Sequence, residues 1–170
     1  MEPVDKNFQK NNITILEGDL RLKTSKIAII VPRFNDFINQ HLLFGALDAL
    51  KRIGNLKNNN IHIIRIPGAY EIPIISNIIA NTEKYNGIIA LGTIIQGETK
   101  HFDMIASTIF NKISEISIKN TIPISLGILT TNTVEQAIQR AGVKYGNKGY
   151  EAAITILEMI NLIQIIYKKD

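Results

Sequence analysis

The sequence predicts an α/β protein: a three-layer α/β/α sandwich with a four-stranded parallel sheet, plus a short strand near the N-terminus. Two observations predict it. Short runs rich in β-branched residues alternate along the chain with longer segments of helical periodicity, and this alternation is typical of parallel sheets covered by helices on both faces. The main strand candidates are also almost continuously apolar, as strands buried on both faces require.

The first elements are two strands and a helix. Residues 13–18 form a short apolar strand candidate, and residues 26–31 form a β-branched run that suits a buried strand. Apolar residues then recur at helical spacing over residues 37–53. We expect the side chain of Asn35 or Asp36 to cap this helix, and a glycine to end it.

The same alternation continues to the C-terminus. A strand over residues 61–66 stops at Pro67-Gly68. Residues 71–80 are expected to be helical, and Pro73 is tolerated there because the first turn of a helix does not use its N–H groups. The remaining elements are expected in the order strand 88–95, helix 102–118, strand 123–129, a helix capped by Thr131 or Thr133 and ended by Gly142, and a final helix over residues 147–167.

Length and composition are those of one domain with a buried core. The chain has 170 residues, of which 45% are hydrophobic and 20% charged. It has no cysteine, which excludes disulfides, thiolate metal sites and a cysteine nucleophile. We expect residues 13–170 to form the single domain and residues 1–12 to be a flexible extension.

Charge and hydropathy indicate the expected surroundings. The net charge is +4, but the lysines are scattered and aromatics make up only 6% of the chain, which indicates a solvated basic surface rather than a nucleic-acid site. The first residues lack the apolar core of a signal peptide, and the apolar segment 154–167 is too short to span a bilayer. We therefore expect a cytoplasmic protein without nucleic-acid or membrane partners.

Chemically distinctive residues follow all four strands of the predicted sheet. They lie at residues 33–35, 67–71, 97–101 and 130–132. Because ligands bind beyond the carboxyl ends of parallel strands, we expect these segments to gather at one site. The third is a Gly/Thr loop that opens a helix, which suits a phosphate. It carries His101, whose imidazole can move protons near neutral pH.

Five motifs resemble those of the 6,7-dimethyl-8-ribityllumazine synthase family, in the family's order and spacing from about residue 13 to residue 162. They are Arg33-Phe34-Asn35, Pro67-Gly68-Ala69-Tyr70-Glu71-Ile72-Pro73, Gly97-Glu98-Thr99-Lys100-His101-Phe102-Asp103, Leu129-Thr130-Thr131-Asn132-Thr133-Val134-Glu135-Gln136-Ala137, and Arg140-Ala141-Gly142 with Gly146-Asn147-Lys148-Gly149-Tyr150-Glu151-Ala152-Ala153.

The resemblance implies a flavodoxin-like fold and a transferase of riboflavin biosynthesis. Its reaction condenses 5-amino-6-(D-ribitylamino)uracil with 3,4-dihydroxy-2-butanone 4-phosphate. The products are 6,7-dimethyl-8-ribityllumazine, phosphate and water, in the penultimate step of the pathway. This condensation needs no metal and no redox cofactor, so we expect none.

The resemblance also implies roles for individual residues. His101 matches the proton shuttle, a general acid and base. The positions that match phosphate binding are Glu98, Thr99, Arg140 and Lys148. The positions that match pyrimidine binding are Phe34, Ala69, Tyr70, Glu71, Thr93, Ile94, Ile95 and Leu126. Taken without the resemblance, His101 fits a helix-capping or surface histidine, Arg140 a solvated residue and Phe34 a core aromatic.

Four positions depart from the family's pattern. Tyr70 stands where phenylalanine is common, which is a mild change. Pro32 removes a backbone N–H before Arg33, and Gln96 replaces a frequent arginine beside the phosphate loop. Leu126 stands where an aromatic residue usually covers the substrate ring. Because leucine can contact a ring but cannot stack on it, we expect weakened pyrimidine binding and retained activity.

The expected partners follow from the same resemblance. The family forms pentamers with active sites between subunits, to which Leu126 and Arg140 come from the neighbour. Some members pack twelve pentamers into an icosahedral shell, and association with riboflavin synthase is a further expectation. Two alternatives stay open: a flavodoxin-like binding module, which should carry a phosphate loop where this chain has Pro32-Arg33-Phe34-Asn35, and a catalytically silent shell-forming or lumazine/flavin-binding protein of the same fold.

Overall fold

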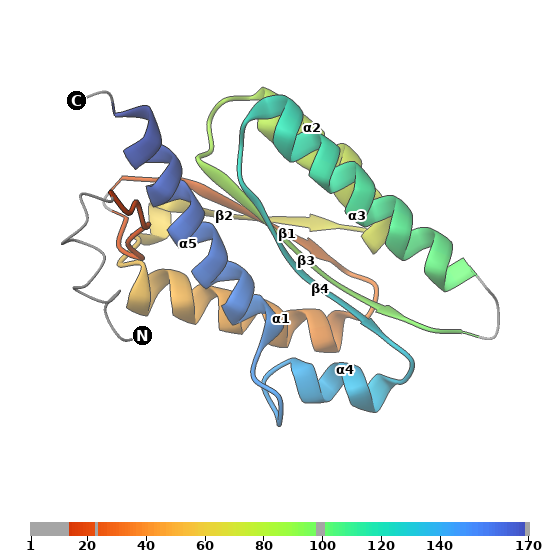
Figure 1. The fold of residues 1–170 in the computed structure, drawn as a ribbon. Coiled ribbons are helices and arrows are strands. Elements are labelled where there is room, and N and C mark those ends of the chain that lie inside the picture. Colours follow the sequence, from red (N-terminus) through yellow and green to blue (C-terminus); the bar gives the residue numbers. More distant parts are fainter. Residues whose placement is uncertain (1–13, 23, 98–100, 169–170) are drawn as a thin grey trace.

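A four-stranded parallel sheet lies at the centre of the computed structural model, which describes residues 14–22, 24–97 and 101–168 (Figure 1). The strand order is β2-β1-β3-β4, and each neighbouring pair is parallel. This is the order of the first four strands in flavodoxin-like sheets. The strands are β1 (Ile27–Pro32), β2 (Ile61–Ile66), β3 (Gly87–Ile95) and β4 (Ile124–Thr131).

Burial of the strands follows their place in the sheet. All six residues of β1 are buried, as are all of β3 except Ile95, because both strands lie inside the sheet and are covered on both faces. β2 lies at an edge, and only Ile66 is fully buried there. The continuous apolar runs of the sequence are therefore those of the central strands.

Helices cover both faces of the sheet, so the predicted three-layer sandwich is confirmed (Figure 1). α1, α4 and α5 pack on one face around a core that includes Leu42, Leu91 and Ile156. α2 and α3 pack on the other face around Ile30, Ile88 and Ile109. The helices are α1 (Asp36–Asp48, continued by a π-helical turn over Ala49–Ile53), α2 (Ile72–Asn81), α3 (His101–Asn120), α4 (Val134–Arg140) and α5 (Lys148–Tyr167).

The strand expected over residues 13–18 does not form in its described part, residues 14–18. Its last residue, Gly18, and the following Asp19 lie against α5 instead of along a strand. A Cβ atom on Gly18 would come within 2.2 Å of the Glu158 carbonyl oxygen, and the Asp19 N–H donates to Asn161 Oδ1 at 2.7 Å. A strand needs the backbone of another strand as its partner, and α5 occupies that position here. The expected extension over residues 1–12 lies outside the described residues.

The expected side-chain cap of α1 is also wrong. Asn35 is the N-cap residue, but it has a left-handed backbone (φ 60°) and its side chain makes no capping hydrogen bond. Its amide donates to the Thr93 carbonyl oxygen at 2.9 Å instead. α4 and α5 do carry side-chain caps, from Thr133 and Asn147.

α5 is longer than the apolar segment expected from the sequence. Among the described residues it is the one helix long and apolar enough to cross a membrane, by length and composition alone. Its inner face, with Ala153, Ile156 and Leu157, is buried in the core beside α1 and the sheet. Its first turn packs closely on α1, since a Cβ atom on Gly149 would lie 2.0 Å from the Leu42 carbonyl oxygen. These contacts explain the apolar character of the inner face of α5.

Candidate active site

A cavity of about 730 Å³ opens at the carboxyl ends of β1, β2 and β3. In this strand order, the chain switches direction between β1 and β3, where sheets of this kind bind ligands. Seven of the eight residues expected at the pyrimidine line this cavity: Phe34, Ala69, Tyr70, Glu71, Thr93, Ile94 and Ile95. Residues at the ends of three of the four strands thus line one cavity.

Two exposed aromatic rings belong to its lining. The exposed fraction is 72% for Phe34 and 65% for Tyr70, so Phe34 is not a core aromatic. Backbone hydrogen bonds hold their two loops together beyond the strand ends: Arg33 N–H donates to the Ile66 carbonyl oxygen at 2.7 Å, and Phe34 N–H to that of Pro67 at 3.0 Å. Exposed aromatic faces at a cavity can stack on a planar ring.

The end of β3 forms a buried part of the lining. Thr93 is 3% exposed and Ile94 is 8% exposed. The Thr93 hydroxyl donates to Asn39 Oδ1 at 2.8 Å, and the Thr93 carbonyl oxygen accepts from the Asn35 amide. The hydroxyl and the carbonyl oxygen of Thr93 are therefore both held by asparagines that follow β1 in the chain.

Glu71 closes the loop that carries Tyr70. Its Oε2 accepts from the Gly68 N–H at 2.9 Å, across the 3-10 turn Ala69–Glu71 that leads into α2. The carboxylate satisfies a backbone donor that the start of a helix leaves free. The loop is thereby fixed at the rim of the cavity.

Two of the expected phosphate ligands lie in a second pocket, of about 390 Å³, beside β4. The Arg140 guanidinium lies 5.6 Å from the centre of the Tyr145 ring, and Nη1 donates to the Gln136 carbonyl oxygen at 3.1 Å. Lys148 Nζ is 2.9 Å from Glu151 Oε2. The pocket is lined by Ile128, Leu129, Thr130, Arg140, Tyr145, Lys148 and Glu151.

The two pockets share none of these lining residues. Thr130 at the end of β4 lines the second pocket, whereas Val134, three residues beyond β4, lines the larger cavity. The expectation that all four strand ends gather at one site stays a prediction. Leu126, 37% exposed on β4, is among the lining residues of neither. β4 is the outer strand beside β3, on the side of β3 that faces away from β1. Its end is therefore farther from β1 than the end of β3 is.

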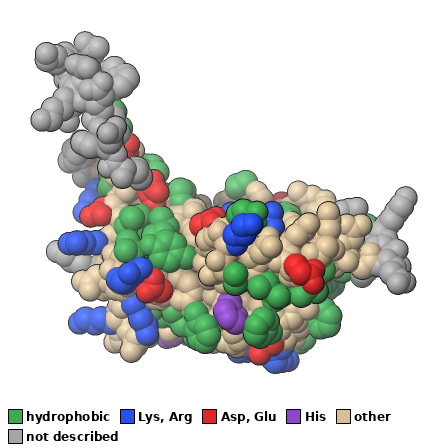
Figure 2. Space-filling view, turned by 90° about the horizontal axis from the view of Figure 1, so that it is seen from below, with side chains coloured by type: hydrophobic (Ala, Val, Ile, Leu, Met, Phe, Trp, Pro, Cys, Tyr) green, Lys and Arg blue, Asp and Glu red, His purple; other side chains and the backbone are tan. Residues whose placement is uncertain are grey.

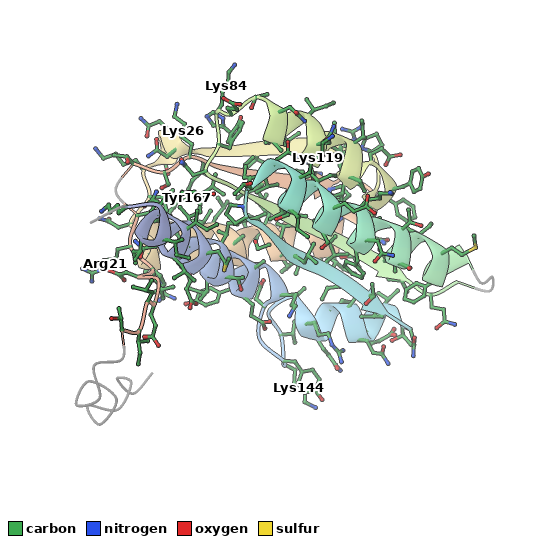
Figure 3. All side chains as sticks on the ribbon, turned by 45° about the horizontal axis from the view of Figure 1, so that its top comes forward. Arg21, Lys26, Lys84, Lys119, Lys144 and Tyr167 are labelled. Carbon is green, nitrogen blue, oxygen red and sulfur yellow. The ribbon has the colours of Figure 1, made fainter. Side chains whose placement is uncertain are left out.

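Positive charge is otherwise spread over the surface. The labelled side chains of Arg21, Lys26, Lys84 and Lys144 lie at separate parts of the periphery (Figure 3). Arg140 and Lys148 differ from them in lining one pocket together. A guanidinium and an ammonium around one hollow are suited to a phosphate.

The loop between β3 and α3 is described only at its ends. Glu98 and Thr99 lie outside the described residues. His101 is the first residue of α3, and its side chain is outside the description as well. Gly97 and Phe102, which flank this segment, both line the larger cavity.

Two carboxyl groups at the starts of helices have lowered pKa values. A hydrogen bond from Arg65 holds the pKa of Asp36 below its usual value, with a smaller contribution from Gln40. Hydrogen bonds from its own backbone N–H and from Thr133 lower the pKa of Glu135. In each case the hydrogen bonds favour the ionised form of the carboxyl group.

The sequence did not single out Phe102, Ile105 and Val134, which also line the cavity. Phe102 and Ile105 are three residues apart at the start of α3, a spacing that places them on one helix face. Asn39 was missed too. Its signal is a lone polar residue beside Ile38 and Leu42 on the apolar face of α1, where a buried amide must find partners.

Comparisons with known proteins agree with this geometry. The sequence profile of a family described as 6,7-dimethyl-8-ribityllumazine synthase matches residues 24–164. Three similar proteins bear the same name. The first, from Buchnera aphidicola subsp. Baizongia pistaciae, is 60% identical over 153 residues, covering 89% of this chain and 96% of the relative. One from Wigglesworthia glossinidia brevipalpis is 57% identical (88% and 97% covered), and one from Yersinia pestis is 48% identical (91% and 99% covered).

Proposed function

Because the chain belongs to the 6,7-dimethyl-8-ribityllumazine synthase family, we propose that its larger cavity binds the ribityl-bearing pyrimidine and that its second pocket binds the substrate phosphate. The chain is an enzyme with lumazine synthase activity in riboflavin biosynthesis. The observation that carries the proposal is the gathering of seven expected pyrimidine residues in one hollow. Its volume, about 730 Å³, is that of a small-molecule site.

The pyrimidine ring stacks on Phe34 in this proposal. Tyr70 and the turn at Ala69–Glu71 contact the ring and the ribityl chain, and the backbone of Thr93–Ile95 offers hydrogen bonds to the ring edge. Aromatic stacking and a few fixed backbone groups are how planar heterocycles are oriented. The buried end of β3 supports this arrangement, because its backbone cannot shift without disturbing the core.

The chemistry needs proton transfers and the departure of phosphate. The 5-amino group attacks the ketone carbon and water leaves, which forms an imine. Phosphate is then eliminated, and the ribitylamino nitrogen closes the ring with loss of a second water. His101 moves the protons. Arg140 and Lys148, with the backbone N–H groups of Glu98 and Thr99 and the Thr99 hydroxyl, bind the phosphate and stabilise its charge as it leaves.

The active unit is a pentamer in this proposal, with Leu126, Arg140 and Lys148 of one subunit completing the cavity of the next. Two observations support it: the ring and phosphate residues line different pockets of one chain, and large apolar side chains are exposed on both helical layers. On α2 and α3 these are Ile74, Ile78, Met104 and Ile118. On the face seen from below, apolar patches lie between charged ones (Figure 2).

The short connection between α4 and α5 bears on the larger assembly. It turns through Gly142 (φ 112°) and Gly146 (φ 75°), and Ala141 pairs with Asn147 across it. The absence of an insertion here resembles the shell-forming members. We infer an assembly of twelve such pentamers in the cytoplasm, where riboflavin synthase would consume the product. Sedimentation separates this shell from a free pentamer by size.

The alternative of a silent shell or lumazine-binding protein has a direct test. Purified protein is mixed with both substrates, and the absorbance of the lumazine product is followed, with each substrate omitted in turn as the control. Product that requires both substrates and the protein supports the proposed site. Intact assemblies that yield no product above the uncatalysed rate would contradict it.

A further inference from the structure

The two central strands separate where the cavity begins. β1 and β3 pair from Ile27 and Gly87 up to Ile30 and Ala90. Beyond that point each strand continues to pair with its other neighbour, β1 with β2 as far as Pro32 and β3 with β4 as far as Ile95. The gap between β1 and β3 therefore has no backbone hydrogen bonds of its own in the described sheet.

One buried amide bridges this gap. Asn39, in the first turn of α1, is 0% exposed. Its Nδ2 donates to the carbonyl oxygens of Pro32 at 3.0 Å and Phe34 at 2.7 Å. Its Oδ1 accepts from the Thr93 hydroxyl at 2.8 Å. Both amide hydrogens and the amide oxygen are thus used, between the end of β1 and the end of β3.

We propose that Asn39 is a positioning residue for the pyrimidine, which sets the separation of Phe34 from Thr93 and hence the width of the ring-binding slot. The inference rests on the proposed function, in which these two residues hold the ring. Asn39 itself is not among the residues that line the cavity. It acts through the backbone on one side and through a hydroxyl on the other.

The chemistry of the bridge requires an amide. A carboxylate would place oxygen against the carbonyl oxygens of Pro32 and Phe34, and an apolar side chain would leave them and the Thr93 hydroxyl without a partner in the core. Asn35 makes a second hydrogen bond to Thr93, because its side-chain amide donates to the Thr93 carbonyl oxygen. Thr93 is therefore fixed at two atoms relative to the loop of Phe34.

The chain offers a matched control at the other end of the same two strands. Asn86 Oδ1 accepts from the Lys26 N–H at 2.8 Å, and the Asn86 N–H donates to the Lys26 carbonyl oxygen at 2.8 Å. This asparagine also joins β1 to β3, but just before the strands begin and away from the cavity. Substitution of Asn86 therefore tests whether weakening the contact between β1 and β3 changes KM in general.

The experiment measures KM for each substrate in Asn39→Ala, Thr93→Val and Asn86→Ala. We expect Asn39→Ala to raise the pyrimidine KM about tenfold, because the loss of one hydrogen bond typically weakens binding by about that factor. The KM for the butanone phosphate should change by less than about twofold in the same variant. Asn86→Ala should leave both KM values within about twofold of the parent while lowering Tm.

Further variants separate positioning from folding. Thr93→Val preserves shape and backbone and removes only the hydroxyl, so it should raise the pyrimidine KM in the same direction, and Thr93→Ser should raise it less. The double variant Asn39→Ala/Thr93→Val should be less than additive, because both changes break one contact. The two Thr93 variants can be measured even if Asn39→Ala does not fold.

Equal KM profiles in Asn39→Ala and Asn86→Ala would overturn the inference, as would additive effects in the double variant. Failure of the proposed function looks different. In that case Phe34→Ala would leave the pyrimidine KM unchanged, whatever the behaviour of Asn39.

Discussion

The two pockets of the chain differ in the same way as the two substrates. The larger cavity presents exposed aromatic rings and the buried end of β3, which suit a flat heterocycle. The pocket beside β4 presents Arg140 and Lys148, partly balanced by Glu151, which suit a phosphate. In one chain the two sets of residues lie in separate hollows. The difference teaches that the ring and phosphate residues occupy separate pockets of one chain, which the proposed pentamer would bring together.

The largest expected effect is that of His101→Ala, which removes the proposed proton shuttle and leaves the residues of both pockets in place. We expect kcat to fall by about 100-fold or more, with much smaller changes in either KM. Steady-state kinetics measure this, and sedimentation confirms that the variant still assembles. A variant that turns over at the parent's rate would remove His101 from the mechanism.

Arg140→Ala and Phe34→Ala should affect opposite substrates. Loss of a charge-assisted contact to phosphate should raise the KM of the butanone phosphate by about tenfold to 100-fold. Loss of the stacking face should raise the pyrimidine KM by about tenfold. Each variant is the control for the other. If both raised the same KM, the division between a ring pocket and a phosphate pocket would be wrong.

Leu126→Phe should have a smaller and favourable effect. The side chain is 37% exposed on β4, where it is available to a neighbouring subunit. A phenyl ring there would stack on the pyrimidine from the other side, and we expect the pyrimidine KM to fall by about threefold. Leu126→Ala provides the opposite change. An unaltered KM in Leu126→Phe would show that this position does not face the ring.

The smallest expected effect is that of a substitution at Asp36, which lies two residues after Phe34. Its pKa lies below the usual value of 3.8 because of Arg65. The resulting stabilisation is present above the pKa of the unfolded chain and is lost as pH falls through the lower pKa of the folded protein. Asp36→Asn should therefore lower Tm slightly near pH 7, by under about 3 °C, and the difference should vanish under strong acid. A difference that grows toward acid pH would contradict the assignment.

Most of the fold could be predicted, because each core element carries a local signal. The β-branched run at residues 26–31 and the helix expected over residues 147–167 agree with β1 and α5 to within one residue. The strand expected over residues 13–18 failed because an isolated apolar segment does not reveal its partner. The backbone of its continuation, at Asp19, is bonded to Asn161 on α5, over 140 positions away in the chain.

The candidate site was only partly predictable, for a similar reason. Motifs that follow Val31, Ile66 and Ile95 were expected at one sheet edge, and their residues do meet there. Whether Thr130 lines the same cavity depends on the order of the strands and on the shape of the sheet edge. No local sequence pattern predicts either. Asn39 was missed because its three bonds reach both its own loop and β3, and a sequence shows only that one polar residue interrupts an apolar face.

The central claim is that one catalytic site uses His101 of one subunit and Arg140 of the next, and hybrid assemblies test it most directly. His101→Ala and Arg140→Ala chains are unfolded together in equal amounts, refolded, and assayed at substrate concentrations below the parent KM values. Random assembly would place an intact His101 beside an intact neighbouring Arg140 in about one quarter of the sites. We therefore predict about one quarter of the parent activity, well above either variant alone. Activity no higher than the average of the two separate variants would show that each chain forms its site by itself.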